Sequence, residues 1–132
     1  MTARRFIAVV GGLVIGLTVL GGAVRAADVE LDMDLMQTIE DTNKSLASNI
    51  AMQDVERSTS DAKELHAMFT QVEAYFVAKG DAPDAIDLSH QSVELADAIV
   101  KSVGEKDFAK AQESATTLSR ACRTCHTFYK KS

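Results

Sequence analysis

The stretch DFAKAQESATTLSRACRTCHTFYKKS, residues 107–132, places its apolar side chains at alternating steps of three and four residues. This spacing predicts an α-helix with one apolar face, because an α-helix makes one turn about every 3.6 residues. The members of that face are Phe108, Ala111, Ala115, Leu118, Cys122, Cys125 and Tyr129. Both cysteines of the chain are therefore expected on the inward side of this helix, one turn apart and near its end.

Three earlier segments show the same periodicity, and no alternating strand pattern is present in the sequence. Asp61 with Glu64 three residues later has the spacing of a helix start, Pro83 suits a first turn, and Gly80 and Gly104 are stop signals. The expected boundaries are residues 29–52 for the first helix, a start within 58–61 and a stop at 79–80 for the second, and a start within 81–84 and a stop at 104 for the third. Four helices with short connections predict an all-α fold, an antiparallel up-down-up-down four-helix bundle.

The inward faces of the first three helices follow from the same count. The expected core residues are Val29, Met36, Ile39, Leu46 and Ile50 in the first helix, Leu65, Met68 or Phe69, Val72 and Phe76 in the second, and Ile86, Val93, Ala96, Val100 and Val103 in the third. Asn43 interrupts the apolar seam of the first helix.

Residues 1–26 have the pattern of an export signal. Arg4 and Arg5 precede an apolar run, and Val24-Arg25-Ala26 supplies small residues for cleavage before Ala27. A retained membrane anchor is the alternative, although the apolar run over residues 6–20 is short for a crossing that needs about 20 residues. We expect a cleaved signal peptide over 1–26, one domain over 27–132, a periplasmic location and no membrane contact after cleavage.

The charge of the chain narrows the classes of partner. Loss of Arg4, Arg5 and Arg25 with the signal peptide lowers the formal net charge from −5 to −8, because no acid is removed. Such a protein has no basic footprint for nucleic acid, whereas its acids could attract a basic partner or simply keep it soluble. The sequence contains no Gly-rich phosphate loop, HExxH pattern or clear Ser-His-Asp arrangement, so an enzyme is not expected.

Cys122, Cys125 and His126 stand at positions i, i+3 and i+4 of the last helix and project from one face. Two thiols one turn apart suit two thioether bonds to a haem, and the adjacent imidazole can reach the iron. A disulfide is the alternative in an oxidising compartment, although it would close a very small loop and leave His126 without a role. Zinc would need four ligands, and a thioredoxin-like couple would normally follow a strand.

The chain resembles the class II cytochromes c, which include cytochrome c-prime. The matching residues are Arg120-Ala121-Cys122, Cys125-His126 and Tyr129-Lys130. The resemblance implies a four-helix bundle with one haem c held at the C-terminal helix, Cys122 and Cys125 as its thioether attachments and His126 as the proximal iron ligand. Two departures are Lys130, where the family commonly has arginine, and a short connection between the first two helices.

The second axial position decides the chemistry of such a haem. In the low-spin branch of this family a Leu-Met pair of the first helix supplies the sixth ligand, and Leu35-Met36 is similar to it. Antiparallel pairing also brings the start of the first helix beside the end of the fourth, with Met36 inward and Met33 turned away. Met36 as a core filler is the alternative, and His90 is a remote second candidate.

Three further residues have expected roles beside the haem. Arg120 and Arg123 are candidates for contacts with the haem propionates, because guanidinium binds carboxylates through two hydrogen bonds, and exposed arginines without that role are the alternative. Tyr129 is expected to shield His126.

The expected function is that of a periplasmic monohaem cytochrome that carries single electrons between redox partner proteins. Basic-faced partners are one possibility, whereas an acidic surface that only keeps the protein soluble is the more common case, and a homodimer is among the oligomeric states left open. The alternative is a five-coordinate cytochrome c-prime that binds nitric oxide or carbon monoxide. A haem-free helical adaptor, with the two cysteines joined as a disulfide, is a third hypothesis.

Overall fold

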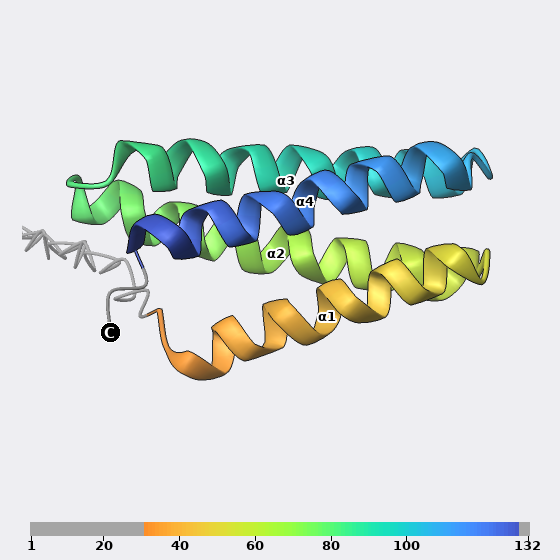
Figure 1. Cartoon of the computed structure of the whole chain (residues 1–132), viewed down its shortest axis with the longest axis horizontal. Helices are drawn as coiled ribbons and strands as arrows, with labels where there is room; N and C mark the ends of the chain where they lie inside the picture. Colours follow the sequence, from red (N-terminus) through yellow and green to blue (C-terminus); the bar gives the residue numbers. More distant parts are fainter. Residues whose placement is uncertain (1–30, 130–132) are drawn as a thin grey trace, which may run out of the picture.

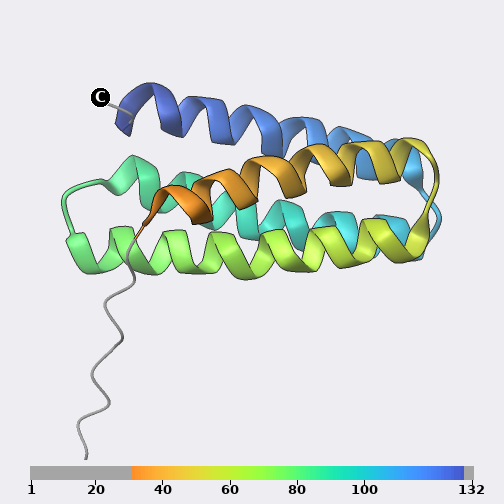
Figure 2. The same cartoon turned by 90° about the horizontal axis from the view of Figure 1, so that it is seen from below.

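The computed structural model describes residues 31–129, which form four α-helices and contain no strand. These helices are α1 (Met33–Ala51), α2 (Val55–Lys79), α3 (Pro83–Gly104) and α4 (Phe108–Tyr129). Consecutive helices run in opposite directions and are joined by short turns (Figures 1 and 2). The predicted all-α, up-down-up-down four-helix bundle is confirmed. The expected signal peptide, Val29 and Lys130 lie outside the described residues.

Most helix ends have the local chemistry that the sequence indicated. Gly80 ends α2 in the left-handed conformation, with φ of 73°, which costs glycine little. Pro83 is the first residue of α3. The predicted start of the first helix at residue 29 is wrong, because α1 begins at Met33. Asp32 caps it there, since its carboxylate accepts a hydrogen bond of 2.7 Å from the backbone N–H of Leu35. After Gly104 it is Lys106, at φ of 60°, that takes the left-handed conformation.

The predicted start of α2 within residues 58–61 is wrong, because the helix begins one turn earlier at Val55. Asp54 caps this start by accepting a hydrogen bond of 3.0 Å from the backbone N–H of Arg57. Gln53 makes the turn before it at φ of 58°, a conformation in which glycine or asparagine is more usual. Ser58, expected in the helix start, is instead completely buried.

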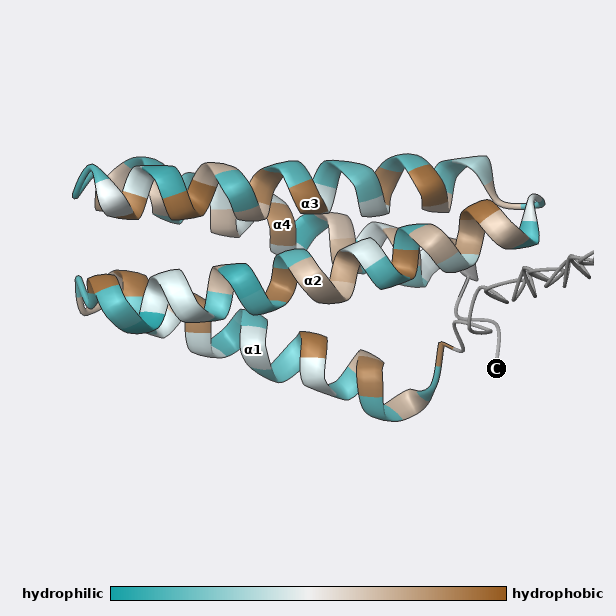
Figure 3. Ribbon diagram, turned by 180° about the vertical axis from the view of Figure 1, so that it is seen from behind, coloured by the Kyte–Doolittle hydropathy of each residue, from teal (hydrophilic) through white to brown (hydrophobic). Residues whose placement is uncertain are grey.

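The core lies between helices that pack in a closed ring, in which each helix contacts its neighbours in the chain and α4 contacts α1. Hydrophobic and hydrophilic residues alternate along every helix, as Figure 3 shows by colour. The most extensive packing joins α2 to α3, and the smallest interface joins α1 to α4.

The inward face of α3 differs from the expected one. Ile86, Val93 and Val100 are only half-buried at the edges of the core. The buried line consists of small and medium residues: Ala85, Ser89, Ser92, Ala96, Ile99, Ser102 and Val103. The hydroxyls of Ser89 and Ser92 are bonded to backbone carbonyls one turn earlier, so that these serines can be buried without losing their hydrogen bonds.

Helix α1 departs from the rest of the bundle toward its N-terminus (Figures 1 and 3). Within residues 31–129, the hydrogen bonds that tie α1 to other helices all come from its second half. Asn49 and Ser45 both donate to the carboxylate of Asp61 on α2, at 2.7 and 2.8 Å. Asn43 donates to the hydroxyl oxygen of Ser119 on α4, at 3.0 Å. The first half of α1 is thus positioned by side-chain packing rather than by polar contacts.

Candidate functional site

The candidate site lies at the end of the bundle where α1 begins and α4 ends. The turn between α2 and α3 is at the same end, so that an end of each of the four helices lies there (Figures 1 and 2). Antiparallel topology alone produces this arrangement, because the start of the first helix and the end of the last must then coincide. The two cysteines, 89 and 92 positions after the start of α1, are thereby brought to the same level as residues 33–42.

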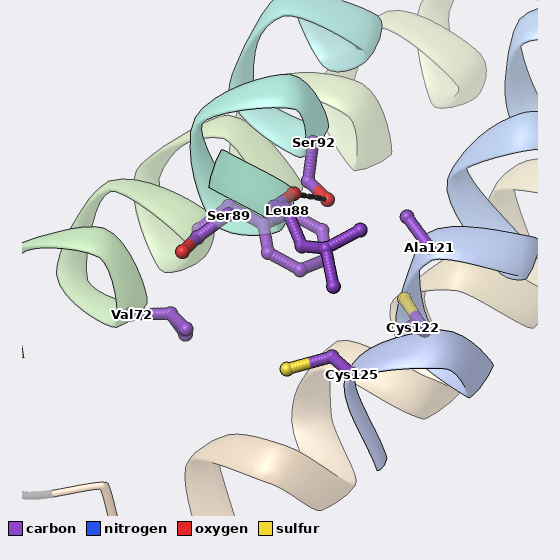
Figure 4. Close-up of a pocket in the computed structure, with 8 residues that line it drawn as sticks. Val72, Leu88, Ser89, Ser92, Ala121, Cys122 and Cys125 are labelled. Carbon is purple, nitrogen blue, oxygen red and sulfur yellow. Dashed lines mark hydrogen bonds between the residues drawn. The ribbon is translucent and has the colours of Figure 1, made fainter. Parts of the chain in front are cut away.

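A recess of about 220 Å³, measured to its open mouth, surrounds the two thiols. Figure 4 shows Cys122 and Cys125 on the side of α4 that faces α2 and α3, with the sulfur of Cys125 directed toward Val72. The lining is almost wholly apolar and consists of Phe69, Val72, Leu88, Ser89, Ser92, Ala121, Cys122 and Cys125. An apolar recess with two thiols in its wall is suited to bind the edge of a flat apolar group.

Both cysteines are free and half-buried. Burial raises the pKa of the Cys122 thiol to about 11, and the neighbouring Cys125 adds to the effect. Burial also raises the pKa of Cys125. Each thiol is consequently protonated at neutral pH. Such thiols are weak nucleophiles for disulfide exchange, which is the opposite of the lowered pKa found at thioredoxin-like redox sites.

His126 lies in the last turn of α4 and is exposed. His126 is close enough to α1 to influence the pKa of Glu40. Lys44 is the main cause that holds this pKa below its ordinary value, and the charge of His126 lowers it further. Glu40 comes one turn after Met36 in α1. The structure therefore brings the imidazole of α4 to the part of α1 that carries Met36.

The methionines differ in their placement. Met36 is half-buried and packs against the core, whereas Met33 is 76% exposed, in agreement with the expectation that it turns away. Met52 is exposed at the opposite end of the molecule, and Met68 is buried in the middle of α2. Met36 is thus the methionine of α1 that faces inward at the level of His126.

His66 and His90 are surface residues that pair with carboxylates. His66 Nδ1 lies 2.8 Å from Asp97, and His90 Nδ1 lies 3.1 Å from Glu73; both pairs bridge α2 and α3. His90 Nε2 also lies 3.7 Å from Glu94. Since both of its ring nitrogens face carboxylates on the outside, His90 is not placed to serve as an axial ligand.

Arg120 and Arg123 are exposed on α4 and form no ion pair within residues 31–129. Their contact with propionates stays a prediction. The side chain of Tyr129 lies outside the described part of the structure, so its expected inward position stays a prediction. The apolar face of α4 packs against the core from Phe108 to Cys125.

The donor set of this site fits a c-type haem. Two protonated thiols lie one helical turn apart and line an apolar recess, and an imidazole follows in the next position. Even with the open solvent at its mouth included, the recess of about 220 Å³ is below the range of about 300–1,000 Å³ usual for ligand sites, so a bound haem would need further room. Residues 31–129 contain no group of three or more His, Cys, Asp or Glu side chains placed to hold a metal ion by themselves.

Sequence reasoning missed two parts of the site. Ser89 and Ser92 of α3 line the recess, but each has a polar neighbour in the sequence, His90 or Gln91, and resembles a surface position. The contact between Asn43 and Ser119 joins residues 76 positions apart. The interruption of the apolar seam at Asn43 was the available signal, because a polar residue on an inward face requires a partner.

No helix within residues 31–129 is long and apolar enough to cross a membrane. Comparisons with models of protein families, with curated proteins and with solved structures find no match to this chain.

Proposed function

We propose that this protein is a c-type cytochrome that carries single electrons. The observation that carries the proposal is the joint placement of Cys122 and Cys125 in one apolar recess, with His126 next in the sequence and near enough to Glu40 of α1 to influence its pKa. The resemblance of the last helix to the class II cytochromes c supports the same reading. Bound haem would supply a one-electron iron couple, and no residue of the chain would need to bind a substrate.

Each site residue then has a specific role. Cys122 and Cys125 hold the cofactor covalently through thioether bonds, and their burial keeps those bonds away from water. His126 supplies the proximal ligand from a position near the surface. Met36 supplies the second axial ligand from α1; a Met/His pair raises the potential and leaves no open position on the iron. Arg120 and Arg123 are free to neutralise the propionates.

The same proposal includes location and partners. A c-type protein with the export signal expected in residues 1–26 would work in the periplasm, and its formal charge of −8 after cleavage favours redox partners with basic faces. Electrostatic attraction of this kind raises the encounter rate and weakens as salt is added.

One observation favours a second candidate, a five-coordinate cytochrome that binds nitric oxide or carbon monoxide. Helix α1 departs from α4 over its first half, and Met36 is only half-buried. If Met36 does not reach the iron, an open axial position is left for a small gas. The two candidates share Cys122, Cys125 and His126 and differ at Met36 alone.

The test of haem attachment uses the full chain expressed in a host that exports and matures c-type cytochromes. The wild-type protein should keep its haem in acidified organic solvent, because thioether bonds survive it. Cys122→Ser and Cys125→Ser should each weaken this retention, and the double variant should lose all of its haem to the solvent. Ser114→Ala, a change at another half-buried position of α4, is the matched control. A wild-type protein without covalent haem would contradict the proposal.

A further inference from the structure

Asn43 interrupts the apolar seam of α1, which also buries the polar residues Thr42 and Asn49, and it makes the only hydrogen bond between α1 and α4 within residues 31–129. Its amide nitrogen donates to the hydroxyl oxygen of Ser119 at 3.0 Å. Its amide oxygen is fully buried and has no partner among the described residues. A leucine here would continue the apolar seam, and a buried acceptor without a partner weakens folding. The amide is therefore not explained by core packing.

The position of this contact relates it to the candidate site. Ser119 precedes Cys122 by one helical turn on α4, and Asn43 follows Met36 by two turns on α1. Two turns of an α-helix span about 10 Å. The contact between Asn43 and Ser119 thus lies just beyond the recess, on the side toward the middle of the bundle.

On the two sides of this contact the helices behave differently. Toward the middle of the bundle, Leu46 and Ile50 of α1 are completely buried and α1 is bonded to Asp61 of α2. Toward the site, Ile39 and Thr42 are still buried, but Met36 is half-buried, and residues 33–42 have no hydrogen bond to another helix within the described part of the chain. The contact is therefore the last polar tie before α1 and α4 separate.

We infer that Asn43 and Ser119 are positioning residues. Their contact fixes the distance between α1 and α4 at the side of the site that faces the middle of the bundle. It thereby sets the distance from Met36 to a group held by Cys122 and Cys125. A single polar contact in an apolar seam is known to fix the register of packed helices at some cost in stability. Where haem is concerned, the inference rests on the proposed function. The part that concerns α1 and the thiols stands without it.

The first test uses Ser119→Ala in the haem-loaded protein, with Ser119→Thr as the variant that keeps the hydroxyl acceptor and Ser114→Ala as the matched control. Ser119→Ala should raise the equilibrium fraction of high-spin iron, and the affinity of the ferrous protein for carbon monoxide, by about five-fold, the factor that one hydrogen bond of ordinary net strength gives. Ser119→Thr should restore the wild-type values. A merely structural role would lower the melting temperature and leave both readouts unchanged.

The second test needs no haem. In the haem-free chain, the rate at which a maleimide labels Cys122, followed by mass spectrometry of its peptide, should rise by about five-fold in Ser119→Ala and stay unchanged in Ser119→Thr and Ser114→Ala. Asn43→Leu removes the same contact while filling the seam, so it serves if Ser119→Ala folds poorly by circular dichroism. Wild-type labelling rates in both Ser119→Ala and Asn43→Leu would overturn the inference. A wild-type protein without haem, combined with the expected labelling rates, would reject the proposed function and keep the inference.

Discussion

Replacement of Met36 separates the electron carrier from the gas binder at one side chain. Truncation of a fully buried methionine to alanine costs about 2–5 kcal/mol, and Met36 is half-buried, so we expect Met36→Ala to lower the free energy of unfolding by about 1–2 kcal/mol. For a domain of this size, that loss lowers Tm by about 5–15 °C. Met36→Leu keeps nearly the same volume and should cost about 1 kcal/mol or less.

Met36→Ala and Met36→Leu should have the same spectroscopic effect although they differ in their loss of stability. Leucine has no sulfur to bind iron, so both Met36→Leu and Met36→Ala should convert a low-spin wild-type protein to high spin and open the ferrous iron to carbon monoxide. Met68→Leu makes the same chemical change at a buried position of α2 that does not line the recess, and should leave the absorption spectrum as it is. Thermal melts and oxidised and reduced spectra of all four proteins are the required measurements.

Two results would refute this reasoning. A wild-type ferrous protein that is already high-spin and binds carbon monoxide readily would show that Met36 does not reach the iron, and the five-coordinate candidate would then replace the carrier. An unchanged low-spin spectrum in Met36→Leu would show that another side chain is the ligand, and Met33 would be replaced next.

Three further predictions concern stability. Asp54→Ala should lower the free energy of unfolding by about 1 kcal/mol, measured by urea denaturation, because it removes the cap of α2; Asp34→Ala, on the exposed face of α1, is the control for the loss of a charge. In the haem-free chain the raised pKa of Cys122 favours the folded state at neutral pH. The free energy of unfolding should therefore fall as the pH rises from 9.0, the ordinary pKa of a thiol, through about 11. An equal fall in wild type and in Cys122→Ala would contradict this. The haem-free chain should melt below the haem-loaded protein, since a group held only by the folded state stabilises it, and equal Tm values in calorimetry would show a bundle complete without a cofactor.

The sequence by itself determined the number of helices and most of their ends. Gly80 and Pro83 act within one turn of the chain, through a left-handed φ and a fixed φ, so that local chemistry is enough to place them. The periodicity of α4 likewise placed Cys122 and Cys125 on one face. The start of α2 was missed because Gln53 turns the chain without glycine and Asp54 supplies a cap that many exposed aspartates could supply.

Tertiary structure decided which faces are buried and which distant residues meet. Ser89 and Ser92 are buried because small side chains let α3 approach α2 closely, and no count along α3 alone reveals that approach. The contact of Asn43 with Ser119 depends on the relative height of two helices at opposite ends of the chain, which is fixed by the packing of the whole bundle and not by either helix alone.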